Sequence, residues 1–202
     1  CAKPPSTRAR SVERLWERRH FSRRRHSSQR RRVHLSARLL LFGLLYAAAM
    51  MVSHLLALEP GHIVIFWLPS GLFLAALWLV RRRQWPAYIL VALTVSLLVN
   101  ILWRHKPWNV AALFATATCV EAVVAALLLR TLFRLRPQTD RVLGSVAMMV
   151  VSLAVAAPLA ALVGATTAAL FLSGPFWREL KCWWLGDLLG VILWAPPVLL
   201  GG

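Results

Sequence analysis

Apolar residues fall in long blocks along the chain, and short polar or charged clusters separate the blocks. A block of about 18 or more apolar residues is long enough to cross a membrane as a helix. A helix that is apolar around its whole circumference does not suit the surface of a soluble domain. We therefore predict an all-α fold, a polytopic transmembrane helical bundle of about six spans. The predicted spans are residues 38–58, 63–80, 85–103, 108–130, 142–172 and 183–200.

The fifth predicted span, residues 142–172, is longer than a membrane requires. A straight helix of this length would measure roughly 46 Å at 1.5 Å per residue, whereas the hydrocarbon core is about 30 Å thick. A break near Pro158 would give two spans, but the residues around it offer no polar turn, and unpaired backbone groups are costly in lipid. We therefore favour one long, tilted helix with a kink at Pro158 over two spans.

The same span carries small residues at every fourth position. Such a ridge lets another helix approach closely within a membrane. The ridge could slide during signalling or pack statically, and the sequence leaves both interpretations open. The predicted helix-packing residues are Ser152, Ala156, Ala160, Gly164 and Ala168.

Positive charge is distributed unevenly over the chain, whose net charge is +17. The arm of residues 1–37, the cluster Arg81–Arg83 and the segment of residues 130–141 hold most of the Lys and Arg, all on one side of the predicted spans. The positive-inside rule therefore predicts a cytoplasmic amino terminus. With an even number of spans, the carboxyl end lies on the same side. The opposite side has only Arg104, Lys106, Arg178 and Lys181.

Composition and tryptophan placement agree with a membrane protein. Hydrophobic residues make up 59% of the chain, against about 45–50% in soluble domains. Tryptophan favours membrane interfaces, where its indole N–H group stays hydrated. Trp85 maps to the predicted inner interface. Those that map to the outer one are Trp103, Trp108, Trp177, Trp183 and Trp184.

Residues 1–37 form a basic arm with few large apolar side chains, so the arm cannot bury enough surface to fold alone. We predict a disordered cytoplasmic arm, followed by a membrane domain over residues 38–202. Each Lys or Arg near a membrane surface contributes about 1 kcal/mol of attraction to anionic lipids, which are therefore expected partners. Phosphate contacts could also bind nucleic acid, but only non-specifically.

Two carboxylic acids lie inside predicted spans, where an acidic side chain is unfavourable by about 2.5–3.5 kcal/mol. Glu121 lies near the middle of the fourth span, and Asp187 lies in the first turn of the sixth. Glu121 could contact a ligand, act as a proton-linked switch or only fix helix packing. Asp187 could equally stabilise the amino terminus of its helix.

The string Trp67-Leu68-Pro69-Ser70-Gly71 lies inside the second predicted span. Proline and glycine weaken a regular helix and free backbone carbonyls, which predicts a broken helix lining a pocket, with a simple kink as the alternative. This string and Asp187 fall in the predicted outer half of the membrane, and Glu121 falls near its midplane. A single pocket that opens outward would join them. The candidate pocket residues are Trp67, Pro69, Ser70, Gly71, Glu121, Trp184, Gly186 and Asp187.

Motifs for metal or catalytic chemistry are missing from the sequence. His54, His62 and His105 lie near the predicted outer side, but their spacing matches no compact ligand motif. Cys119 and Cys182 suggest no disulfide framework. The sequence contains no phosphate-binding, dinucleotide or nucleophile fingerprint. We therefore expect no enzymatic activity, no metal and no cofactor in this chain.

The residues resemble the first membrane-associated sensor (MASE) family. The string from Trp67 to Leu77 is similar to the opening of that family, with Leu68 where a second proline is common. The block from Trp183 to Val191, with Ala195 and Pro196, is similar to a later motif and is the most specific part. The resemblance covers roughly residues 38–200.

This resemblance implies a bacterial, multi-pass sensor of the inner membrane that detects an unknown cue. It also implies regulation of a cytoplasmic output domain: a diguanylate cyclase, a cyclic-di-GMP phosphodiesterase or a histidine kinase. Because the chain starts at Cys1 and stops at Gly202, we expect an incomplete sensor domain whose output is absent. A homodimer is a possible assembly. The alternative functions are a small-solute transporter and a membrane-anchoring scaffold.

Overall fold

The computed structural model of the chain describes residues 34–57, 66–135, 146 and 150–200. The chain divides into two compact units, Cys1–Leu41 and Phe42–Gly202. The described part of the first unit, residues 34–41, is helical and begins the helix His34–Leu55. Residues 1–33 of the predicted arm lie outside the described residues. The following paragraphs concern the second unit.

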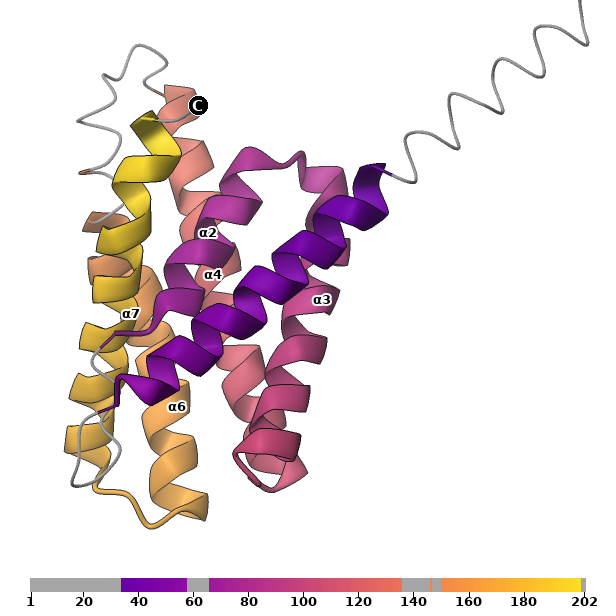
Figure 1. The fold of residues 1–202 in the computed structure, drawn as a ribbon. Coiled ribbons are helices and arrows are strands. Elements are labelled where there is room, and N and C mark those ends of the chain that lie inside the picture. Colours follow the sequence, from indigo (N-terminus) through magenta and orange to yellow (C-terminus); the bar gives the residue numbers. More distant parts are fainter. Residues whose placement is uncertain (1–33, 58–65, 136–145, 147–149, 201–202) are drawn as a thin grey trace, which may run out of the picture. The chain divides into compact units, whose positions relative to one another are not determined.

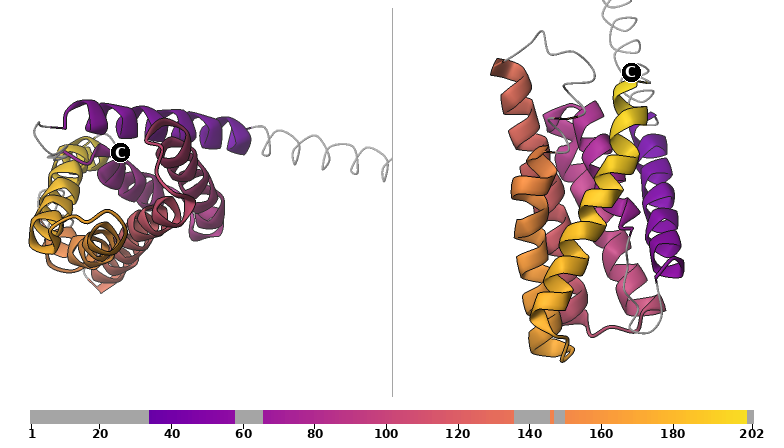
Figure 2. Two further views of the ribbon diagram at one scale, coloured as in Figure 1. Left: turned by 90° about the horizontal axis from the view of Figure 1, so that it is seen from below. Right: turned by 90° about the vertical axis from the view of Figure 1, so that its left-hand side faces the viewer.

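Helices make up the second unit, and no strand occurs among its described residues, which confirms the predicted all-α fold. Helix α2 packs against α4 and α7, while α6 also packs against α4 and α7, so these four helices form a ring of neighbours. Helix α3 packs on the outside of α4. Figures 1 and 2 show α2, α3, α4, α6 and α7 running side by side. After the first helix, the elements are α2 Leu68–Leu79, η1 Arg82–Gln84, α3 Trp85–Leu98, η2 Val99–Trp103, α4 Trp108–Leu135, η3 Ser152–Ala156, α6 Ala157–Phe171 and α7 Phe176–Leu200.

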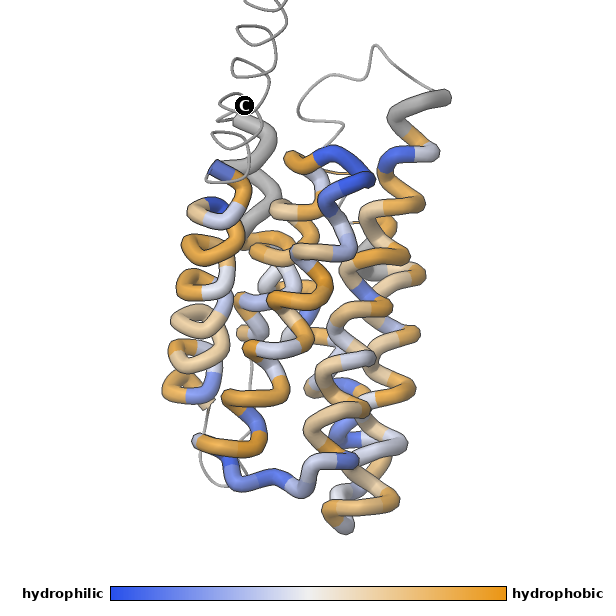
Figure 3. Tube along the Cα trace, turned by 90° about the vertical axis from the view of Figure 1, so that its right-hand side faces the viewer, coloured by the Kyte–Doolittle hydropathy of each residue, from blue (hydrophilic) through white to orange (hydrophobic). Residues whose placement is uncertain are grey.

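The helices present apolar surface outward. Hydrophobic residues run along the helices, and hydrophilic residues gather at the two ends of the bundle (Figure 3). Leu55, Leu102 and Leu170 are each at least 68% exposed, which suits a surface that contacts lipid tails. Within the described residues, the helices long and apolar enough to cross a membrane are His34–Leu55, Arg82–Trp103, Trp108–Leu132 and Ala154–Phe171. The chain is therefore a multi-pass membrane protein.

Helix α2 begins at Leu68, not at residue 63 as predicted, although residues 63–65 lie outside the described residues. Pro69 lies in the first turn, where its missing N–H group removes no helical hydrogen bond. The string around it therefore starts a helix, and the predicted break inside a span stays a prediction, because residues 58–65 lie outside the described residues. At 12 residues, α2 is about 18 Å long, which is shorter than the hydrocarbon core of about 30 Å.

Neighbouring helices satisfy the free N–H groups at the start of α2. The Trp67 N–H donates to the Gly186 carbonyl of α7 at 3.0 Å. The Leu68 N–H donates to Ser53 Oγ, which lies on the first helix, also at 3.0 Å. Since lipid offers no hydrogen-bond partners, non-helical backbone at this depth requires such cover from the protein.

Arg130 holds the opposite end of α2. Its Nη2 donates to the carbonyls of Leu77 at 2.9 Å and Trp78 at 3.1 Å, and also to that of Val80. The guanidinium lies 4.9 Å from the centre of the buried Trp85 ring. A cation at a helix carboxyl end complements the helix dipole, so Arg130 ties α4 to the last turn of α2.

Helix α7 begins at Phe176, well before the predicted start at residue 183. Ser173 has a φ of 54°, and the Gly174 N–H donates to the Ala168 carbonyl, so α6 ends in a left-handed cap. Pro175 then opens α7, because its carbonyl accepts from the next free N–H groups. Asp187 therefore lies about three turns into the helix. The interpretation of Asp187 as a first-turn cap is wrong.

The described residues are helical on both sides of Pro158. A π-helix, Ser152–Ala156, leads directly into α6. Such a wide turn accommodates a proline, which has no N–H group to donate to the preceding turn. Residues 142–145 and 147–149 of the fifth predicted span lie outside the described residues.

Small residues bring α6 and α7 close together. Ala156, Ala160, Gly164 and Ala168 are all buried, while the side chain of Ser152 is outside the described part of the chain. A Cβ atom at Gly164 would lie 2.4 Å from the Trp183 ring of α7. The predicted small-residue ridge thus lies against α7, and whether the ridge slides stays a prediction.

Gly190 is expected to tolerate no side chain. A Cβ atom there would lie 2.0 Å from the Trp67 carbonyl oxygen, which belongs to the backbone and cannot turn away. We expect Gly190→Ala to lower the free energy of unfolding by about 1–3 kcal/mol, as overpacking does. Thermal unfolding in detergent, followed by circular dichroism, measures the change.

Gly174→Ala is the matched control. The atoms nearest to its Cβ belong to the flexible Glu179 side chain, at 3.2 Å or more. Equal stability of the two alanine variants would contradict the close crossing of α7 and Trp67.

Candidate functional site

Ser70 joins two buried carboxyl groups from different helices. Its Oγ lies 2.9 Å from Glu121 Oε2 on α4 and 2.8 Å from Asp187 Oδ1 on α7. All three residues are buried. Ser70 lies in the first turn of α2, so the start of that helix aims the hydroxyl at both carboxyls. We call Ser70, Glu121 and Asp187 the buried triad.

The buried triad must hold at least one proton besides that of the hydroxyl. A serine hydroxyl has one hydrogen and therefore donates to one carboxyl oxygen at a time. The second short contact needs a hydrogen on the other carboxyl, which then donates to Ser70 Oγ. Two ionised carboxylates this close in a medium of low dielectric would also repel each other strongly. Ser70 thus links the protonation of Glu121 to that of Asp187.

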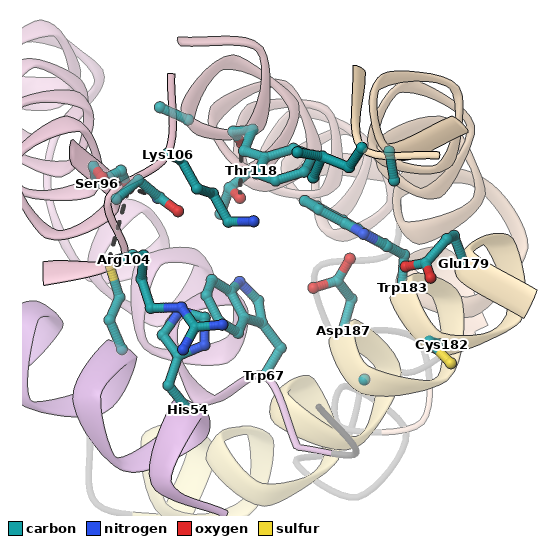
Figure 4. Close-up of a pocket in the computed structure, with 17 residues that line it drawn as sticks. His54, Trp67, Ser96, Arg104, Lys106, Thr118, Glu179, Cys182, Trp183 and Asp187 are labelled. Atoms are coloured by element: carbon teal, nitrogen blue, oxygen red, sulfur yellow. Dashed lines mark hydrogen bonds between the residues drawn. The ribbon is translucent and has the colours of Figure 1, made fainter. Parts of the chain in front are cut away.

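A cavity of about 160 Å³ lies beside the buried triad, with Asp187 in its wall. Its lining comes from the first helix, α3, η2, α4, α6 and α7, together with Trp67 before α2, the connection before α4 and Leu172 after α6 (Figure 4). A cavity of about 150 Å³ accommodates a molecule of the size of benzene. The lining is mixed, with aromatic faces from Trp67, Phe114 and Trp183 beside polar and charged groups.

Opposite charges lie on opposite walls of this cavity. Figure 4 shows Arg104 and Lys106 on one side, with Asp187 and Glu179 on the other. His105, with a φ of 50°, forms the turn between the two cations. Burial lowers the pKa of the Lys106 ammonium, the charge of Arg104 lowers it further, and Glu179 acts in the opposite direction. The cavity is therefore bipolar.

Several buried polar atoms in the cavity wall lack a hydrogen-bond partner among the described residues. They belong to His54, Trp67, Arg104 and Asp187. Asp187 is 2% exposed, and while its Oδ1 contacts Ser70, its Oδ2 has no such partner. Buried polar groups are nearly always hydrogen-bonded, so these atoms are free to bond to water or to another polar molecule in the cavity.

The structure brings most of the predicted pocket residues to one place. Trp67, Gly186 and Asp187 line the cavity. Ser70 and Glu121 do not line the cavity, but the hydrogen bonds of the buried triad connect them to Asp187, which does.

Two other predicted residues, Pro69 and Gly71, are buried in the first turn of α2 and are not among the lining residues. Trp184 is 38% exposed and is not among the residues that line the cavity. Trp183 lines the cavity instead. The reason is helical phase: residues 183, 186 and 187 share one face of α7, whereas residue 184 is turned away by about 100°.

Sequence reasoning missed His54, Arg104 and Lys106 as lining residues. Arg104 and Lys106 lie on the predicted outer side, where the positive-inside rule leads one to expect few cations. Their presence there was the feature of the sequence that could have identified them as site residues. Asn100 also lines the cavity, and its Nδ2 donates to the Ser96 carbonyl at 2.9 Å, four residues back in the chain.

A metal centre finds no support in the described part of the chain. No group of three or more His, Cys, Asp or Glu side chains gathers there. His62, one of the histidines considered above, lies outside the described residues.

The fold and the site together define a multi-pass membrane protein whose helices surround a cavity with cationic groups on one wall and carboxyl groups on the other. The chain belongs to the MASE1 family, whose family model matches residues 37–201. MASE1 is a membrane-associated sensor domain, which confirms the resemblance seen in the residues. The domain is sensory and not catalytic. No curated protein and no solved structure matches the chain.

Ser70→Ala should destabilise the bundle, because both carboxyls lose their common partner. Leaving a buried polar group unsatisfied costs about 1–3 kcal/mol. We expect a loss of that size in the free energy of unfolding, measured by denaturation in mixed micelles. Thr94→Ala is the control, since the exposed Thr94 hydroxyl donates only to Leu90 of its own helix. Equal effects of the two variants would show that Ser70 does not hold the carboxyls.

Glu121→Gln should be tolerated better than Glu121→Leu. The glutamine amide can donate to Ser70 Oγ as a protonated carboxyl does, whereas leucine cannot. We expect the glutamine variant to unfold within about 1 kcal/mol of the wild type. Equal damage by both variants would contradict a hydrogen bond between Glu121 and Ser70, because the glutamine side chain can both donate and accept.

Proposed function

We propose that this chain is an integral-membrane sensory module that detects a cue in the cavity and regulates a cytoplasmic signalling output. The output would be a diguanylate cyclase, a cyclic-di-GMP phosphodiesterase or a histidine kinase. Membership of the MASE1 family supports the sensory role. The observation that carries the proposal is the Ser70 hydroxyl, which joins α2, α4 and α7 beside the cavity.

A cue in the cavity would act through Asp187. Any molecule that contacts Asp187 Oδ2 changes the charge and the hydrogen bonding of a carboxyl that Ser70 shares with Glu121. The cue shifts the equilibrium between two arrangements only if it binds them with different affinity. The part of the structure that differs between the two arrangements would then be the contact of α2 with α4 and α7.

Two helices can carry this change away from the cavity. Helix α2 runs from the cavity wall at Trp67 to the clamp that Arg130 forms on its last turn. Helix α7 continues from Asp187 to Leu200. In the predicted orientation both helices end towards the cytoplasm, and the cavity opens outward. The signal would therefore cross the membrane along α2 and α7.

Further partners belong to the same proposal. The module would lie in the bacterial inner membrane, with its basic arm on anionic lipids of the cytoplasmic leaflet. A homodimer would suit cytoplasmic output domains that act as dimers. A small-solute transporter is the second candidate, because a helix that begins within the bundle beside a polar cavity is also found in transporters.

Variants of the buried triad should change signalling without removing the protein from the membrane. We fuse the chain to a diguanylate cyclase reporter and measure cellular cyclic-di-GMP. Ser70→Ala and Asp187→Asn should each shift the output several-fold, because they alter the link between α2 and α7. Thr116→Ala, an exposed residue of α4 that bonds only to Ala112, should leave it unchanged.

Other outcomes would favour the competing functions. Unchanged output in both triad variants, together with unchanged output after replacing all spans by an unrelated anchor, would indicate a scaffold. Solute uptake by proteoliposomes that contain the chain would indicate a transporter.

A further inference from the structure

We propose that the cavity binds a small zwitterion, a molecule with a carboxylate at one end and a cationic nitrogen at the other. The inference deepens the proposed function, because it names the chemical class of the cue and rests on the cavity being the cue site.

One wall of the cavity suits the carboxylate. Arg104 and Lys106 both line it, and neither has an ion pair among the described residues. The buried Arg104 Nε and the Trp67 indole N–H add donors without partners in the described structure. A carboxylate bound here would accept charge-assisted hydrogen bonds and relieve the repulsion between two neighbouring cations.

The facing wall suits a cationic nitrogen. Asp187 Oδ2 is a buried acceptor with no partner in the described part of the chain, and Glu179 also lines this side. Glu179 has an exposed partner in Arg178 at 3.2 Å. The buried triad needs one extra proton, and with that proton on Glu121 the uncompensated carboxylate of this wall is Asp187. The ring of Trp183 borders the same space, and aromatic rings attract ammonium groups.

A ligand with only one charge fits less well. An anion would lie against the carboxyl group of Asp187, and a cation would lie against Arg104 and Lys106. In a site of low dielectric such like-charge contacts are strongly unfavourable. A zwitterion brings the opposite charge to each wall, so both walls are satisfied by one molecule (Figure 4).

The volume sets the size of the molecule. A cavity of about 160 Å³ holds a molecule slightly larger than benzene, roughly six to ten non-hydrogen atoms. Amino acids with short side chains and small betaines have this size.

Binding to the full chain, purified and placed in lipid nanodiscs, tests the inference. The probes are L-valine and glycine betaine, with isovalerate and isobutylamine as the matched molecules that lack the cationic nitrogen or the carboxylate. Equilibrium dialysis gives each dissociation constant, and the melting temperature gives an independent readout. We expect at least one zwitterion to bind at least tenfold more tightly than either single-charge analogue.

Variants of the two walls should then weaken zwitterion binding. Asp187→Asn and Lys106→Gln should each raise the dissociation constant about tenfold or more, which corresponds to about 1.4 kcal/mol. Lys106 lies in a connection and not in a helix, so its variant keeps the test valid if Asp187→Asn fails to fold. Thr94→Ala, away from the cavity lining, should bind as the wild type does.

The results separate this inference from the proposed function. If neither zwitterion binds, or if isovalerate binds as tightly as L-valine, the zwitterion inference is wrong, and the reporter experiment still decides the sensory role. If a zwitterion binds but the triad variants leave the reporter output unchanged, the binding site stands and the proposed signalling role fails.

Discussion

Lipid tails offer no hydrogen-bond partners, so each polar group inside this bundle must find its partner within the protein. That constraint explains the start of α2, where the Trp67 N–H reaches the Gly186 carbonyl and the Leu68 N–H reaches Ser53. It also explains the buried triad, in which one hydroxyl serves carboxyls from two other helices. The polar contacts that solve this problem are the contacts that hold α2, α4 and α7 together, so the site and the fold depend on the same bonds.

Close approach of the helices is the second requirement of these bonds. The Trp67 backbone can reach Gly186 only because Gly190, one turn further along α7, has no side chain to hold the two segments apart. Gly164 does the same for the Trp183 ring against α6. Small residues therefore set the helix spacing, and the spacing sets the hydrogen-bond distances of the site.

The cavity owes its character to the low dielectric around it. Charges on facing walls interact far more strongly there than in water, so in the proposed site Arg104 and Lys106 opposite Asp187 would favour a ligand with a matching pattern of charge. Asp187 belongs to both the cavity and the buried triad, so the proposed recognition of a cue and the proposed change at α2 would share one residue.

Apolar block length and short motifs are local properties of a chain, so the amino-acid sequence alone was enough to predict the helices, the membrane environment and the family. It also identified Ser70, Glu121 and Asp187 as residues of interest, since polar groups inside apolar spans are costly wherever they point. The three-dimensional structure was needed to show that Ser70 lies between carboxyls 51 and 117 positions away in the chain. It was also needed to show that α7 begins at Phe176 and that Trp183, Arg104 and Lys106 line the cavity. A helix that is apolar all round carries little record of which face points inward, so packing against its neighbours sets its rotation.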